Sequence, residues 1–192
     1  EITNTHYKLV GIVIHSGGAH GGHYYSNRLI NDKLINGLGI SFSHQNNYMW
    51  GKVFKYPNTV AHLIAGIHDR NVFEYLAKFD GKILILGYKN WGRGKTYYSE
   101  EIKNNIGWLR DNLKDYLNKF KVVSFDNLAI EQLDVKALLS DSEWKSFYQG
   151  DDGTMTMYVD AVKEEFAKTS TSSKRFELKN TIEDMFEVIK NV

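Results

Sequence analysis

Short runs of apolar residues recur along the first part of the chain, and each run ends in glycine or polar residues. Runs of this length are typical of strands that are buried on both faces of a parallel sheet. Between them, apolar residues recur at helical spacing, and the longest such segment follows Ser99, which stands where an N-cap is expected. The pattern predicts strands at residues 8–14, 38–42, 60–67, 83–86 and 121–125, and helices at residues 26–35, 71–79 and 99–120.

The alternation of strands and helices predicts an α/β fold with a parallel sheet and right-handed crossovers. We expect residues 1–126 to form an incomplete parallel (β/α) barrel of about five strands. Residues 127–192 differ, since an Asp-Gly turn leads into a short hairpin of residues 155–159 and 165–168, and residues 181–192 carry a helical apolar stripe. This part is predicted to be a small α+β extension that packs on the barrel within one structural domain.

Composition narrows the functional classes. The 192 residues carry a formal net charge of +1, which gives no indication of a nucleic-acid-binding surface. No apolar stretch is long enough to span a bilayer, so we expect a cytoplasmic protein without a membrane partner. The sequence contains no cysteine, which excludes disulfides, thiolate metal ligands and a cysteine nucleophile within it.

Three stretches resemble radical S-adenosylmethionine (radical SAM) proteins, particularly the phage and bacterial members. They are FDGKILILGYKNWGRGK at residues 79–95, KVVSFDNLAIEQLDV at residues 121–135 and FYQGDDGTMTMYVD at residues 147–160. The resemblance covers residues 37–192 and implies the SAM-facing, C-terminal part of a partial TIM barrel. In that family the ends of the fourth, fifth and sixth strands hold SAM.

Carried over by position, the resemblance implies that six residues bind SAM: Ser41, Ser43, Gly66, His68, Gly87 and Tyr88. The family also holds an iron–sulfur cluster on three cysteines, and this sequence has none. The resemblance therefore implies the SAM-facing C-terminal portion of a radical SAM-like enzyme, which is inactive alone because it lacks the cluster loop. We expect the missing N-terminal part of the domain, or another chain, to be its partner.

A second resemblance is local. Residues 7–25, YKLVGIVIHSGGAHGGHYY, are similar to the histidine box of ubiquitin-specific proteases. The similarity implies that His23 is the general base of a thiol hydrolase, although the cysteine that such a base activates is absent. The alternative function is thus a ubiquitin-hydrolase-like element. The interpretation that we favour is that residues 8–14 form a barrel strand whose glycine-rich loop only mimics the box.

Other polar residues leave alternatives open. His15, His44 and His68 each follow a predicted strand, so they are either zinc ligands at one edge of the sheet or hydrogen-bonded loop residues. Lys89, Trp91, Arg93 and Lys95 form a basic loop that either meets a phosphate or a base, or is simply solvated. A cluster-free scaffold that binds a partner or a small molecule is a third class of function.

Overall fold

Five parallel strands form one sheet in which the strand order follows the chain order. They are β1 (Gly11–Ile14), β2 (Gly37–Ser41), β3 (Thr59–Ile64), β4 (Lys82–Leu86) and β5 (Val122–Phe125). This computed structural model describes residues 11–14, 32, 37–43, 50–56 and 58–192. The predicted α/β class with about five parallel strands is confirmed, and the sequential order is that of successive strands in a (β/α) barrel.

Helices follow the strands, as the alternating pattern predicted. They are α2 (Trp50–Val53), α3 (Arg70–Ala77), α4 (Arg93–Tyr97), α5 (Glu100–Leu117) and α6 (Asn127–Gln132), and a 3-10 helix spans Val135–Leu138. Ser99 caps α5 by accepting a hydrogen bond from the backbone N–H of Ile102, which confirms the predicted N-cap. The predicted helix at residues 26–35 falls almost entirely outside the described residues. The short helices α2 and α4 were not predicted.

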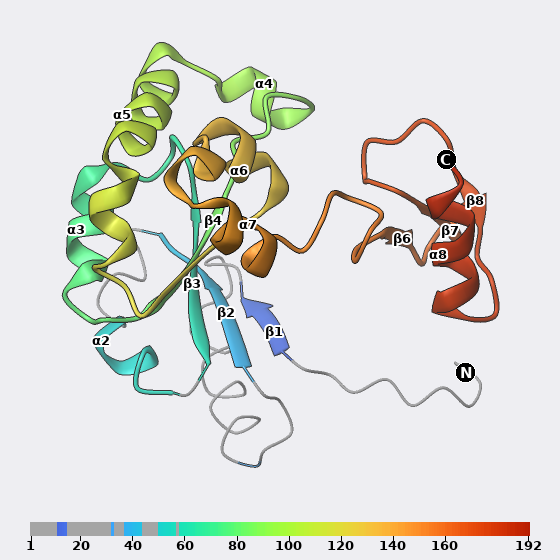
Figure 1. The fold of residues 1–192 in the computed structure, drawn as a ribbon, viewed down its shortest axis with the longest axis horizontal. Helices are drawn as coiled ribbons and strands as arrows, with labels where there is room; N and C mark the ends of the chain where they lie inside the picture. The colour runs from blue at the N-terminus through green and yellow to red at the C-terminus, as the bar shows by residue number, and fades with distance from the viewer. Residues whose placement is uncertain (1–10, 15–31, 33–36, 44–49, 57) are drawn as a thin grey trace. The chain divides into compact units, whose positions relative to one another are not determined.

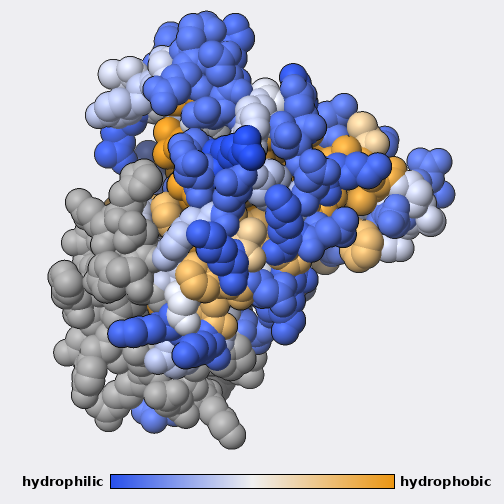
Figure 2. Space-filling model, turned by 90° about the vertical axis from the view of Figure 1, so that its left-hand side faces the viewer, coloured by the Kyte–Doolittle hydropathy of each residue, from blue (hydrophilic) through white to orange (hydrophobic). Residues whose placement is uncertain are grey.

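The buried residues of the central strands lie on one face of the sheet. Alternate residues of the central strands are buried, including Ile40 of β2, Leu63 of β3 and Ile85 of β4. Helices α3 and α5 lie side by side over the sheet (Figure 1), and Phe73 of α3 packs against Tyr116 of α5 with ring centroids 5.6 Å apart. Among the described residues, hydrophilic side chains cover most of the surface seen in Figure 2, with apolar side chains visible between them.

On the other face of the sheet the described strand residues are less buried. The residues that alternate with the core positions are half-buried or exposed, among them Ser41, His62, Leu84 and Ser124. The expectation of strands buried on both faces is therefore wrong for β2 to β5. The sequence does not reveal this alternation in burial, because residues such as Val60 and Leu84 are apolar although they lie on the less buried face.

The chain divides into two compact units, Glu1–Leu138 and Leu139–Val192. Helix α6 and the 3-10 helix therefore belong to the first unit, although the sequence placed the boundary after Asp126. That the second unit packs on the first stays a prediction.

The second unit contains α7 (Asp141–Phe147), α8 (Ile182–Lys190) and a three-stranded antiparallel sheet of β6 (Tyr158–Asp160), β7 (Glu165–Ala167) and β8 (Phe176–Glu177). The pairing of β6 with β7 confirms the predicted hairpin, with shifted bounds, whereas β8 was not predicted. Its core is formed by Phe166, Met185 and Ile189. Thr181 caps α8, so the predicted closing helix is also confirmed.

Two glycines with positive φ provide a test of the packing beneath α5. Gly66 has φ +85°, and a Cβ atom there would lie 2.7 Å from Ile102 Cγ2 and 2.9 Å from the Ile102 carbonyl oxygen. Gly92 has φ +55°, with no atom near enough to meet a Cβ. We expect Gly66→Ala to lower the free energy of unfolding in urea by about 2–4 kcal/mol, from backbone strain and overpacking together.

The comparison variant Gly92→Ala should cost only the backbone term, about 1–3 kcal/mol, because its φ of 55° and ψ of −133° are strained for any residue with a Cβ. Equal losses in the two variants would show that α5 does not pack closely on Gly66.

Candidate functional site

The segments that follow β2, β3, β4 and β5 lie beside one another at the carboxyl edge of the sheet. The backbone N–H of Phe42 donates to the carbonyl of His62 at 3.0 Å, and that of Ala65 donates to Leu86 at 2.8 Å. On the other side of β4, the N–H of Asp126 donates to Ile85 at 3.1 Å. Parallel strands bring residues that are distant in sequence together at this edge, which is where α/β folds bind ligands.

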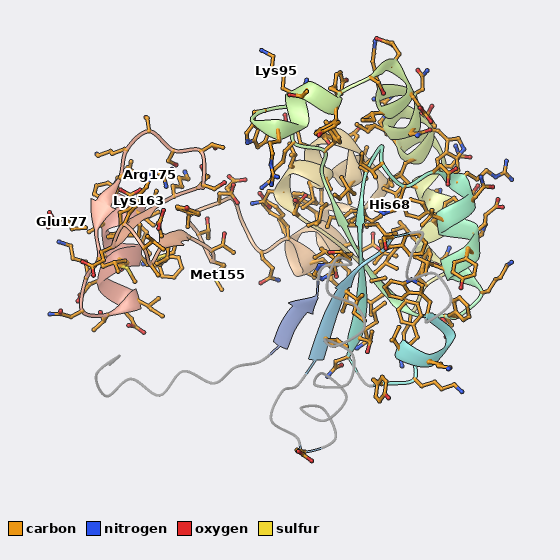
Figure 3. All side chains as sticks on the ribbon, turned by 180° about the vertical axis from the view of Figure 1, so that it is seen from behind. His68, Lys95, Met155, Lys163, Arg175 and Glu177 are labelled. Atoms are coloured by element: carbon orange, nitrogen blue, oxygen red, sulfur yellow. The ribbon has the colours of Figure 1, made fainter. Side chains whose placement is uncertain are left out.

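His68 ties two strand ends together through its ring. The side chain is buried, and its Nδ1 accepts a hydrogen bond from the backbone N–H of Ile64 at 2.8 Å. A neutral ring that accepts at Nδ1 has its proton on Nε2, which lies 3.4 Å from the carbonyl oxygen of Phe42. Figure 3 shows His68 at the sheet, and its ring meets that of Phe42 edge-on with centroids 5.5 Å apart. Both ring nitrogens of this predicted site residue thus have backbone partners.

The two predicted site glycines permit close approach of the helices. At Gly87 a Cβ atom would lie 2.4 Å from Leu128 Cγ and 2.7 Å from the backbone nitrogen of Ala129 in α6. Asp126 holds this contact, because its Oδ1 accepts hydrogen bonds from the N–H of Gly87 at 2.9 Å and of Ala129 at 2.7 Å. Gly66 is approached by α5 in the same way. Both glycines therefore have a packing role that is independent of any ligand.

Tyr88 is fixed by a side chain that is distant in sequence. Its backbone N–H donates to Gln132 Oε1 at 2.8 Å, and its carbonyl accepts from Gln132 Nε2 at 2.9 Å. Its hydroxyl donates to the carbonyl of Gly94 at 2.6 Å, and its ring lies 5.6 Å from that of Tyr98. The backbone, hydroxyl and ring of the buried Tyr88 thus all have contacts that hold the residue in a fixed position.

A cavity of about 600 Å³ lies next to Tyr88, between the segment after β4, helix α5 and helix α6. It combines aromatic rings, side-chain amides and charges of both signs. The lining residues are Tyr88, Asn90, Tyr98, Lys103, Asn104, Ile106, Gly107, Trp108, Arg110, Asp111 and Gln132. Its volume is in the range of roughly 300–1,000 Å³ that is common for small-molecule sites. The arrangement can stack a planar ring and pair with a charged group.

Of the six residues that the resemblance implied, Tyr88 lines this cavity. Ser41, Ser43, Gly66, His68 and Gly87 lie along the same edge of the sheet, on or after β2, β3 and β4. The alternative catalytic residue, His23, lies outside the described residues, as do His15 and His44. Within the described part of the chain, no group of three or more His, Asp or Glu side chains could hold a metal ion.

The predicted basic loop is only partly a loop. Arg93 and Lys95 belong to α4, and Lys95 projects away from the sheet (Figure 3). The cavity instead takes its cations from α5, where Lys103 and Arg110 are exposed. Sequence reasoning missed Gln132 and Trp108, because a glutamine near the end of a short helix and a tryptophan within an amphipathic helix give no local signal of a site.

No family model, curated protein or solved structure matches this chain. The radical SAM and ubiquitin-protease resemblances therefore stay predictions. Among the residues that the structure describes, no helix is both long and apolar enough to cross a membrane.

The bidentate contact of Gln132 with Tyr88 can be tested by mutation. Gln132→Ala removes the partners of two backbone groups at a part-buried position, so we expect the free energy of unfolding to fall by about 1–3 kcal/mol. The neighbouring Glu131 is exposed, and Glu131→Ala should change stability by less than about 0.5 kcal/mol. Urea unfolding measures both, and equal effects would contradict the positioning role of Gln132.

Proposed function

We propose that this chain is the SAM-facing portion of a radical SAM-like enzyme, and that it binds the adenosine part of SAM at the carboxyl edge of its sheet. The observation that carries the proposal is the cavity beside Tyr88, which joins this edge to α5 and α6. The parallel sheet with sequential strand order and the sequence resemblance both favour ligand binding at the carboxyl edge.

The chemistry of the cavity suits a ligand with a flat ring. Tyr98 is 39% exposed and faces the fixed ring of Tyr88, so one face of a purine can stack on it. Amide groups of Asn90 and Asn104 supply donors and acceptors that can read the edge of a base.

The ionic groups suit the amino-acid end of SAM. Arg110 and Lys103 can pair with its carboxylate, while Asp111 can meet its ammonium or sulfonium charge. Each cation already lies 3.4 Å from an acidic oxygen, Lys103 from Glu100 and Arg110 from Asp111. Because these pairs are exposed, they are weak and can open to admit a ligand.

The iron–sulfur cluster of the family does not fit this sequence, because the chain has no cysteine to ligate it. The residues present can bind and orient SAM but have no group to reduce it. The cluster would have to be supplied by an N-terminal part of the domain or by another chain. We propose a cytoplasmic location, because no apolar stretch of the sequence is long enough to span a bilayer.

Binding can be measured by titration calorimetry with SAM and with adenosine. We expect weak binding of both, and a roughly five- to tenfold lower affinity in Tyr98→Ala, since that variant removes the ring on which the base stacks.

The adjacent Tyr97 is 72% exposed and does not line the cavity, so Tyr97→Ala is the matched control and should bind like the wild type. Absence of binding at millimolar concentrations, or an equal effect of the two variants, would refute the site.

Catalysis gives a separate test of the alternative function. The isolated chain should neither cleave SAM nor hydrolyse a ubiquitin ester, because both reactions require cysteines that it lacks. Turnover of a ubiquitin reporter that is lost in His23→Ala would contradict this expectation and favour the protease-like function.

A further inference from the structure

A second cavity lies at the opposite, amino edge of the same sheet. Its volume is about 370 Å³, and it is bordered by the chain entering β3 and β4 and by Lys121, which precedes β5. None of its lining residues is shared with the cavity beside Tyr88. It is therefore a separate site, independent of the function proposed above.

Three lysines line this cavity: Lys55 after α2, Lys82 in β4 and Lys121 before β5. The Nζ of Lys82 donates to Asn58 Oδ1 at 2.8 Å, which positions it at the entrance to β3. Among the residues that the structure describes, no carboxylate lies within ion-pair distance of these lysines, although Asp80 also lines the cavity. Three cations against one acid leave the cavity with an excess of positive charge.

Thr59 gives an independent indication of a ligand. This residue lines the cavity, is only 3% exposed, and its Oγ1 has no hydrogen-bond partner within the described structure. A buried hydroxyl without a partner is destabilising, so its retention calls for an explanation. An anion held by the three lysines would accept the hydrogen bond that this hydroxyl can donate.

The remaining wall is aromatic. The rings of Phe54 and Phe79 lie 6.2 Å apart, and Tyr56 completes the wall. Phe54 can occupy this position because the residue just before β4 is a glycine: a Cβ at Gly81 would lie 2.5 Å from Phe54 Cε1. A ligand here would place its anionic group on the lysines and a ring against the aromatic side chains.

We propose that the amino edge of the sheet binds a phosphate monoester that carries a ring, as nucleotides do. Ammonium groups and a hydroxyl are suitable donors to phosphate oxygens, and the cavity has room for a ring beside them. Lys55 and Lys121 supply charge from exposed positions, whereas Lys82 and Thr59 line the cavity at the starts of β4 and β3.

The probe for this site is phenyl phosphate, compared with inorganic phosphate and phenol in calorimetry on the full chain. We expect phenyl phosphate to bind most tightly and its affinity to fall with added sodium chloride. Phenol that binds as well as phenyl phosphate would overturn the anion site, and inorganic phosphate that binds as well would overturn the role of the aromatic wall.

Two variants test the residues. The double variant Lys55→Ala, Lys121→Ala should weaken phenyl phosphate binding by about tenfold and flatten its salt dependence. Lys114→Ala, which removes an exposed lysine of α5 outside both cavities, is the matched control and should leave the affinity unchanged. Equal losses in the double variant and the control would overturn the proposal.

Thr59→Val is the sharper test, because valine keeps the branched shape and replaces the hydroxyl with a methyl group. Without ligand the variant should unfold at the same temperature or a higher one, since an unpartnered buried group is gone. Its affinity for phenyl phosphate should fall by about tenfold. An unchanged affinity, or a lower unfolding temperature in the absence of phosphate, would contradict the assignment. Tyr98→Ala should leave the affinity for phenyl phosphate unchanged. A failure of the phosphate site can therefore be told apart from a failure of the SAM site.

Discussion

The carboxyl edge of the sheet depends on side chains that satisfy backbone groups where the strands stop pairing. His68 bonds to the backbone of β3 and of the segment after β2, Asp126 bonds to Gly87 and to α6, and Gln132 bonds twice to Tyr88. Each contact spans different elements, and a buried backbone group left without a partner would be costly. These bonds connect the ends of β2, β3 and β4 to their neighbours, and the bonds between Gln132 and Tyr88 join two residues that line the cavity.

Close packing imposes the second constraint. Helices α5 and α6 can approach the strand ends only because Gly66 and Gly87 have no side chain. The resemblance to radical SAM proteins assigned these glycines to a ligand, whereas the structure gives each of them a neighbour in a helix. The two roles are compatible, because a backbone whose Cβ side is packed on a helix can still face a ligand with its opposite side.

The strands and the long helix were predictable because their signals are local. Apolar runs identify β2 to β5, and Ser99 marks the start of α5. The short helices α2 and α4 and the short strand β8 have too few residues to show a period. Of the site, the sequence predicted only its location at the carboxyl edge of the sheet. A histidine after a strand suggests a ligand, and only the three-dimensional structure places the His68 ring on backbone groups. The pairing of Gln132 with Tyr88 joins residues of different elements, for which the sequence has no signal.

The two cavities at opposite edges of one sheet differ in chemistry, with amides and mixed charges beside Tyr88 and lysines beside Thr59. The central claim, that the carboxyl edge binds the adenosine part of SAM, is tested most directly by mapping backbone amide signals in NMR spectra during a titration with adenosine. The account predicts that the signals of Tyr88, Asn90, Tyr98 and Ile106 shift, while those of Thr59, Lys82 and Lys121 stay in place. Shifts confined to the amino edge, or none at saturating adenosine, would contradict it.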